Sequence, residues 1–420
     1  MSQPAATSPH PGMGFPAFVC MMAMLMALGA LGIDAMLPVL PTIAHSLGAG
    51  GQNSQQWIVT AYLLGFGVAQ IVYGSLADRY GRKPVLLAGL AIFTLASVAA
   101  AFSPNFEAML TFRVIQGIGA SATRVVPISI IRDCYEGRPM ARVMSLTSLV
   151  FMAIPILAPT IGQAIVSVAP WPWVFGVFAI GALIMGAWMA LKLPETLHPE
   201  YRIPIKVGPI LHAFAVTLRD RTGTGYTLAS TLTFGALFGF INASQQVFET
   251  ALHAADKFTL IFALIAGFIA IASLVNARLV DRLGTRALSH GALIAFIVTG
   301  AVHTAVAFSG HETLLTFTVL QAIMMFAFGL MAGNFAAMAM ENLGHVAGAA
   351  SSAQGFISML GGTLIGFVIG QQFDGTVGPV TLGYLVCGLL ALIAVLFAEK
   401  GRLFRAHHAG QGGGDVVSFH

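Results

Sequence analysis

Long apolar stretches alternate with short polar connections along almost the whole chain. A stretch of about 20 apolar residues is long enough to cross a bilayer as a helix. Such windows fall near residues 16–40, 56–76, 85–103, 108–131, 143–166, 172–192, 223–246, 256–276, 287–308, 313–336, 348–370 and 381–399. The pattern therefore predicts an all-α membrane protein with twelve transmembrane helices in two six-helix bundles.

A short charged phrase occurs twice in the chain. It reads LADRYGRK at residues 76–83 and LVDRLGTR at residues 279–286. Each copy follows the second predicted helix of its half, and each is flanked by apolar runs. A repeat of half the chain length is typical of membrane transporters whose two halves are parallel copies.

Charge is scarce and unevenly placed. Only 9% of the residues are charged and 57% are hydrophobic, whereas a soluble domain carries about 25% charged residues. With the N-terminus inside, the 20 Lys and Arg residues lie on the inner side except Arg113, Arg124 and Lys257, as the positive-inside rule requires. This bias predicts a multi-pass inner-membrane protein with both termini in the cytoplasm. The same bias accounts for the net charge of +4, so this charge does not indicate nucleic-acid binding.

The polar intervals divide the chain into four parts. Residues 193–222 are rich in Pro, Lys and Arg, and residues from about 406 onward are rich in Gly. We expect an N-terminal bundle at 1–192, a cytoplasmic linker at 193–222, a C-terminal bundle at 223–405 and a flexible cytoplasmic tail at 406–420.

Several other classes of function find no support in the sequence. The three cysteines are scattered, and His and Cys show no metal-ligand spacing. A nucleophile elbow and a phosphate-binding loop are also missing from the sequence. The first fifteen residues lack Lys and Arg, so no cleavable signal peptide is expected. We therefore expect a protein that is not an enzyme and that has no cofactor and no metal.

Asp34 is the only acid within the membrane interior of the first half. A carboxylate there is costly, and such groups normally face a cavity, pair with a cation or relay protons. Burial favours its neutral form and a nearby guanidinium favours its charged form. We expect Asp34 and Arg113 to couple proton movement to transport. The alternative is a permanent ion pair between them, and the role of Arg124 is open.

Other intramembrane polar residues are candidates for substrate binding. Arg113 and Gln116 share one helix face by their spacing. Hydrogen bonds that merely join helices are the alternative role for all such residues. With Asp34, the expected substrate-binding residues are Tyr62, Gln116, Asn242, Gln245, Gln246 and Asn334.

These motifs together resemble the Bcr/CflA drug exporters of the major facilitator superfamily. The resemblance rests on the loop phrase at 76–83, IDAMLPVLP at 33–41, RVIQGIGA at 113–120, IRDCYEG at 131–137, LPETL at 193–197 and GHVAGAAS at 344–351. It spans residues from about 30 to 370. One departure is Gln163, which stands where the antiporter motif of the fifth helix usually has a glycine.

The resemblance implies a proton-coupled efflux transporter for small amphipathic drugs that works by alternating access as a monomer. Its partners are then a drug, protons and the lipid bilayer. A metabolite transporter with the same fold is one alternative, and a sensor or scaffold that does not transport is another. The resemblance also implies a gating latch, for which a simple turn is the alternative. The expected gating residues are Asp78, Arg79, Gly81, Arg82, Asp281, Arg282 and Gly284.

Overall fold

The protein is described by a computed structural model covering residues 12–204, 207–343 and 347–404. The twelve helices long and apolar enough to cross a membrane confirm the predicted all-α membrane fold. The predicted tail at 406–420 and part of the phrase at 344–351 lie outside the described residues. The main helices are α1 (Phe15–Asp34), α3 (Gln56–Tyr80), α4 (Arg82–Ala101), α5 (Phe106–Cys134), α6 (Gly137–Val168), α7 (Pro172–Lys192), α9 (Arg221–Gln246), α10 (Phe258–Leu283), α11 (Thr285–Phe308), α12 (Leu314–Ala339), α13 (Ala347–Gln371) and α14 (Gly378–Ala398).

The first membrane span is broken, whereas the sequence predicted one run from 16 to 40. Helix α1 ends at Asp34, and the chain continues through the short turn η1 (Leu37–Val39) into α2 (Leu40–Ser46). Pro38 lies inside this turn and Pro41 lies at the start of α2. Proline lacks the N–H that would continue the helical ladder, so the ladder stops here. Asp34 therefore lies at a helix end inside the span.

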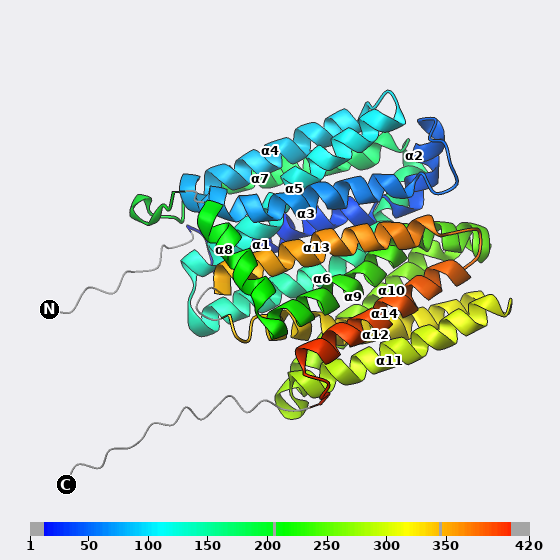
Figure 1. Ribbon diagram of the computed structural model, residues 1–420. Helices are drawn as coiled ribbons and strands as arrows, with labels where there is room; N and C mark the ends of the chain where they lie inside the picture. Colours follow the sequence, from blue (N-terminus) through cyan, green and yellow to red (C-terminus); the bar gives the residue numbers. More distant parts are fainter. Residues whose placement is uncertain (1–11, 205–206, 344–346, 405–420) are drawn as a thin grey trace, which may run out of the picture.

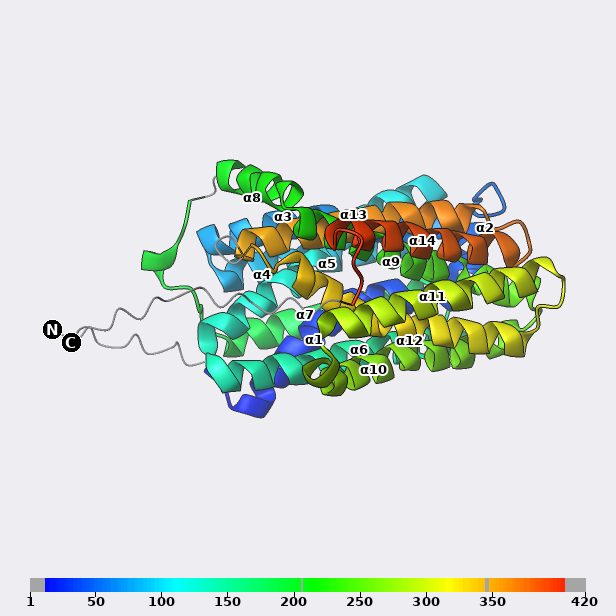
Figure 2. The ribbon, with the colours of Figure 1, turned by 60° about the horizontal axis from the view of Figure 1, so that its bottom comes forward.

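Helices α1 to α7 pack mainly with one another, and so do α9 to α14. In the first group α5 packs against α3 and α4, and in the second α9 packs against α13 and α14. The two groups meet where α3 packs on α13 and where α6 packs on α10. Figures 1 and 2 show all of these helices running roughly parallel in one bundle.

The two ends of the bundle carry different short helices. Helix α2 lies at one end, which we call the α2 end (Figure 1). The interval predicted as a linker contains the turn η2 (Pro199–Tyr201) and helix α8 (Val207–Arg219). Helix α8 lies at the opposite end, the α8 end, where the Phe214 ring contacts the Phe356 ring of α13. The sequence pattern did not predict α8, because thirteen residues are too few to span a membrane.

Close contact between backbones explains part of the high glycine content. A Cβ at Gly117 of α5 would lie 2.1 Å from the Tyr62 carbonyl oxygen of α3. Small residues of this kind let helices approach closely in lipid, where no hydrophobic effect draws them together. Helix α6 is continuous through Pro155 and Pro159.

At the α2 end, α9 continues as the π-helical turn η3 (Val247–Ala251), and η4 (Ala255–Lys257) leads into α10. These short elements close the connection between α9 and α10. They also place two acids, Glu249 and Asp256, at the surface of the α2 end.

Candidate functional site

Asp34 is a buried carboxyl group that forms no ion pair with the residues that the structure describes. Its relative exposure is 4%, and its Oδ1 atom is buried without a hydrogen bond. Among the described residues, the ion pairs involve other acids and do not include Asp34. A buried charge that lacks both a cation and a donor is strongly disfavoured. The geometry therefore suits a carboxyl group that carries a proton in this conformation.

Arg113 does not form the ion pair with Asp34 that sequence reasoning held open. Its guanidinium is fully buried and donates to the Gly32 carbonyl at 2.9 Å, the Ile58 carbonyl at 3.0 Å and the Gln116 side chain at 2.5 Å. Gly32 belongs to the last turn of α1, whose carbonyls lack helical partners. Arg113 therefore ties the broken end of α1 to α3 and α5.

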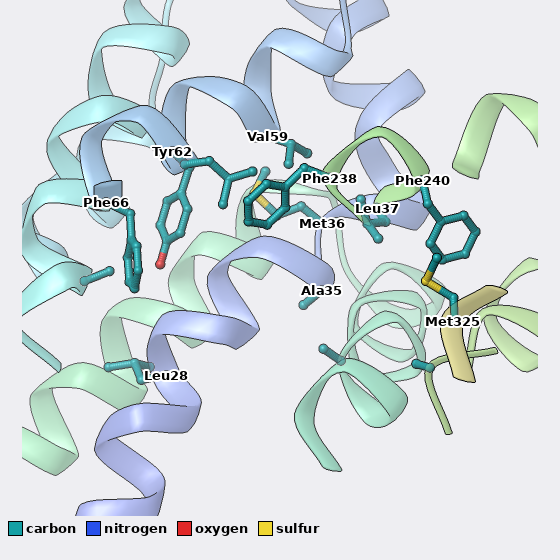
Figure 3. Close-up of a cluster of buried hydrophobic side chains, with 14 of the residues drawn as sticks. Leu28, Ala35, Met36, Leu37, Val59, Tyr62, Phe66, Phe238, Phe240 and Met325 are labelled. Carbon is teal, nitrogen blue, oxygen red and sulfur yellow. The ribbon is translucent and has the colours of Figure 1, made fainter. Parts of the chain in front are cut away.

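Tyr62 and Gln116 complete this buried cluster around Arg113. The Arg113 guanidinium lies over the Tyr62 ring at 4.3 Å, and the Tyr62 hydroxyl donates to the Gly29 carbonyl at 2.7 Å. Gln116 donates to the Ser97 hydroxyl at 2.7 Å. Figure 3 shows Tyr62 of α3 with its hydroxyl directed at α1, beside Phe66. Both predicted substrate-binding residues therefore serve helix packing in this conformation, and their contact with substrate stays a prediction.

The residues that follow Asp34 are held by helix α6. A Cβ at Gly162 would lie 1.8 Å from the Ala35 carbonyl oxygen, so only glycine allows this approach. The neighbouring Gln163 is exposed on α6. Met36 and Leu37 pack with Phe238 of α9 and Val59 of α3 in the apolar cluster of Figure 3. The break in the first span thus lies where both groups of helices meet.

Amide side chains join the two groups of helices at the α2 end. Gln56 donates to Gln246 at 2.6 Å, and Gln55 donates to Gln245 at 2.7 Å. Gln371 donates to Gln56 at 3.1 Å, and Asn53 donates to the Gln371 carbonyl at 3.1 Å. We call these residues the amide cluster: Asn53, Gln55, Gln56, Gln245, Gln246 and Gln371. The cluster joins the two groups of helices at the α2 end, and the ion pairs among the described residues do not involve it.

Two predicted substrate-binding residues, Gln245 and Gln246, therefore lie in the amide cluster. Asn242 is one turn deeper, where its side-chain oxygen lies 3.4 Å from the Thr60 hydroxyl and its Nδ2 is buried without a partner. Asn334 of α12 donates to Asn276 of α10 at 2.8 Å. Asn334 thus joins two helices here, and a role for these four residues in binding substrate stays a prediction.

The first copy of the repeated phrase forms a compact ionic cluster. Gly81 has φ +105°, a backbone conformation that favours glycine and that separates α3 from α4. Arg82 pairs with Asp78 and, at 3.0 Å, with Asp133 at the end of α5. Glu195 accepts from the backbone N–H groups of Arg82 and Lys83 at the start of α4, at 2.9 and 3.2 Å. Arg79 is exposed.

The second copy is arranged differently. Gly284 again has positive φ, +80°, but Asp281 and Arg282 are exposed and form no ion pair within the part of the chain that the structure describes. The buried cation is Arg286, which pairs with Glu341 at 2.6 Å and Glu399 at 2.7 Å.

The Glu399 carboxylate also accepts from the Tyr226 hydroxyl at 2.7 Å. This ionic cluster therefore joins the α8 ends of α9, α11, α12 and α14. Sequence reasoning did not single out Tyr226, Glu341 or Glu399, because no local motif marks them. The gating roles assigned to both copies of the phrase stay predictions.

Comparisons with known proteins agree with this architecture. Residues 22–366 match the model of the Major Facilitator Superfamily. The chain is 30% identical over 392 residues to the uncharacterized MFS-type transporter YdgK of Bacillus subtilis, covering 92% of this chain and 96% of the relative. It is 26% identical over 389 residues to a bicyclomycin resistance protein homolog of Haemophilus influenzae, covering 92% and 97%.

Solved structures show the same fold. The crystal structure of a D-xylose–proton symporter superposes with a TM-score of 0.70 at 13% identity, covering 92% of this chain and 98% of that one. At this identity the likeness concerns the fold alone. The relatives confirm the resemblance drawn from the sequence motifs, and the family model covers most of the chain, so this protein belongs to the major facilitator superfamily.

Proposed function

We infer that this protein exports small amphipathic compounds across the cytoplasmic membrane in exchange for protons. The observation that carries this proposal is the buried, unpartnered carboxyl of Asp34 at the break in the first span. The name of the relative from Haemophilus influenzae supports an antibiotic of the bicyclomycin class as one substrate. The adaptable Met and Phe side chains around the break suit substrates of varied shape.

The orientation follows from the placement of charge. Arg79, Arg82 and Arg282 lie at the ends of α3, α4 and α10 that are remote from α2, whereas Lys257 of η4 lies at the α2 end. Basic residues collect on the cytoplasmic side of membrane proteins. We place the α8 end in the cytoplasm and the α2 end outside, so the amide cluster closes the outer side of the transporter.

Asp34 would then exchange its proton between two conformations. In the described conformation the outer end is closed, and a proton on Asp34 removes the cost of an uncompensated buried charge. A cationic or hydrogen-bonding substrate that enters from the cytoplasm would displace that proton. Rocking of the two groups of helices would next separate the amide cluster and expose the site outward. An outer proton then returns to Asp34 as the substrate leaves.

Arg113 positions the proton site and does not carry the proton. Its three donors hold the last turn of α1, α3 and α5 together beside Asp34. A guanidinium stays protonated in proteins. Its fixed positive charge would favour the charged form of Asp34 when water enters the site.

The test is drug resistance of sensitive cells that express the wild type, Asp34→Asn or Asp256→Asn at equal membrane abundance. Asp256 is an exposed acid at the α2 end and serves as the matched control. We expect resistance to bicyclomycin or chloramphenicol from the wild type and from Asp256→Asn, and none from Asp34→Asn. Full resistance from Asp34→Asn would contradict proton coupling at this residue. Resistance from none of the three would favour the metabolite transporter or the sensor.

A further inference from the structure

An apolar groove of about 330 Å³ lies between α11 and α12. From α11 it is lined by Ala287, Gly291 and Ala295, and from α12 by Phe326 and Leu330. Leu283, the last residue of α10, lies at one end of the groove and is 55% exposed. A Cβ at Gly291 would meet no heavy atom within 4 Å. The groove is therefore open at Gly291, and Asp34 is not among its lining residues.

The groove extends through one half of the membrane thickness. It begins at the α8 end, at Leu283, and its α11 wall runs from Ala287 to Ala295. Eight residues of α-helix cover roughly 12 Å, close to half of a hydrocarbon core of about 30 Å. A helix from a second copy of the chain would cross the whole core of about 30 Å, more than twice the length of the groove's α11 wall. The length of this groove instead matches one lipid leaflet.

Positive charge lies next to Leu283, at the α8 end of the groove. Arg282 is adjacent to Leu283, and Arg278 is one helical turn earlier; both side chains are exposed. Neither forms an ion pair within the described residues, and Asp281 between them leaves one positive charge in excess. Arg286, by contrast, is already bound to Glu341 and Glu399. Exposed cations beside an apolar groove suit a lipid with an anionic headgroup.

We propose that this groove binds one acyl chain of an anionic phospholipid from the cytoplasmic leaflet, with the headgroup phosphate at Arg282. The choice of leaflet rests on the orientation proposed above. The site is separate from the proposed proton site, since its lining residues come from α10, α11 and α12 and do not include Asp34. It also gives Arg282 a role that the first copy of the repeated phrase does not share.

The test is native mass spectrometry of the purified full-length protein with phosphatidylglycerol or phosphatidylcholine of identical chains. We expect one tightly retained phosphatidylglycerol on the wild type. Gly291→Leu should fill the groove and remove binding of both lipids. Gly267→Leu is the matched control, because a Cβ at Gly267 of α10 also meets no heavy atom within 4 Å. Ala295→Leu fills the deeper end of the groove and serves if Gly291→Leu does not fold.

Arg282→Gln should lower the preference for phosphatidylglycerol about fivefold, which corresponds to one basic residue near an anionic surface. Arg202→Gln, at an exposed arginine of the linker, should leave the preference unchanged. Undiminished lipid retention by Gly291→Leu and Ala295→Leu would overturn the proposal, and so would a dimer that these variants dissociate. Because retention is measured without transport, its failure is distinguishable from a failure of proton coupling.

Discussion

Gln56 is the centre of the amide cluster, and its replacement by leucine should open the α2 end. Its side chain is fully buried. It donates to Gln246 at 2.6 Å and to the Gly370 carbonyl at 2.9 Å, and it accepts from Gln371 at 3.1 Å. Leucine has a similar size but makes none of these bonds. In an outward-open conformation water would hydrate all of these amide groups, so the variant loses stability mainly in the closed form.

The expected size of the shift follows from the three lost hydrogen bonds. A hydrogen bond contributes about 1 kcal/mol net, and a partner left buried and unsatisfied adds to the cost of removal. Three bonds therefore correspond to about 3 kcal/mol, or a change of roughly a hundredfold in the ratio of closed to open protein. A protein that is about 99% closed would become about half open.

The assay is pulsed electron spin resonance with spin labels at His45 of α2 and Asp256 of η4. Both residues are exposed at the α2 end, one in each group of helices. The three native cysteines are replaced beforehand. We expect a single short distance in the parent protein and a second, longer distance in Gln56→Leu. Gln52→Leu is the control, since Gln52 lies just before α3 and contributes only its backbone carbonyl to the described contacts of the cluster.

An unchanged distance distribution in Gln56→Leu would refute this reasoning. It would mean that apolar packing, for example between α3 and α13, holds the α2 end closed and that the amide bonds add nothing measurable. An equal shift in Gln52→Leu would also count against the cluster, because that side chain joins no helices.

Three further variants test other contacts. Arg113→Lys should lower the melting temperature in detergent, because one ammonium cannot replace a guanidinium that donates to carbonyls of α1 and α3 and to Gln116 of its own helix, a loss of about 2–4 kcal/mol; an unchanged melting curve would contradict this. Gly162→Val should abolish export in cells while the protein still inserts, since its Cβ would lie 1.8 Å from the Ala35 carbonyl oxygen; normal export would show that α6 can move aside. Asp78→Asn should weaken the pairing with Arg82 and slow drug efflux from vesicles without loss of drug binding. Efflux at the wild-type rate would show that the loop serves only as a turn and not as a latch.

The fold could be predicted from the sequence because its signals are local. Twelve apolar windows and the bias in basic residues are properties of the chain alone, and they predicted the spans that the structure describes. Asp34 stood out for the same reason, because a carboxyl within an apolar run has few explanations. The break after Asp34 could also have been predicted from the sequence, since Pro38 and Pro41 lie only a few residues further on.

The partners of these residues could not be predicted, because they come from remote parts of the chain. Arg113 was singled out, but its acceptors are backbone carbonyls of α1 and α3, which every residue carries. The bond from Gln56 to Gln246 joins residues 190 positions apart. Likewise, the repeat drew attention to Asp281, whereas the buried cation beside it is Arg286. Tertiary packing determines which residues become partners in each of these cases.

The central claim is that Asp34 holds the proton that a drug displaces. It is tested most directly by adding drug to purified protein in weakly buffered detergent solution near neutral pH and recording proton release with a pH indicator. The account predicts that the wild type releases up to one proton per bound drug, and that Asp34→Asn binds a neutral drug without release. Equal proton release from Asp34→Asn would contradict the account, because another group would then carry the proton.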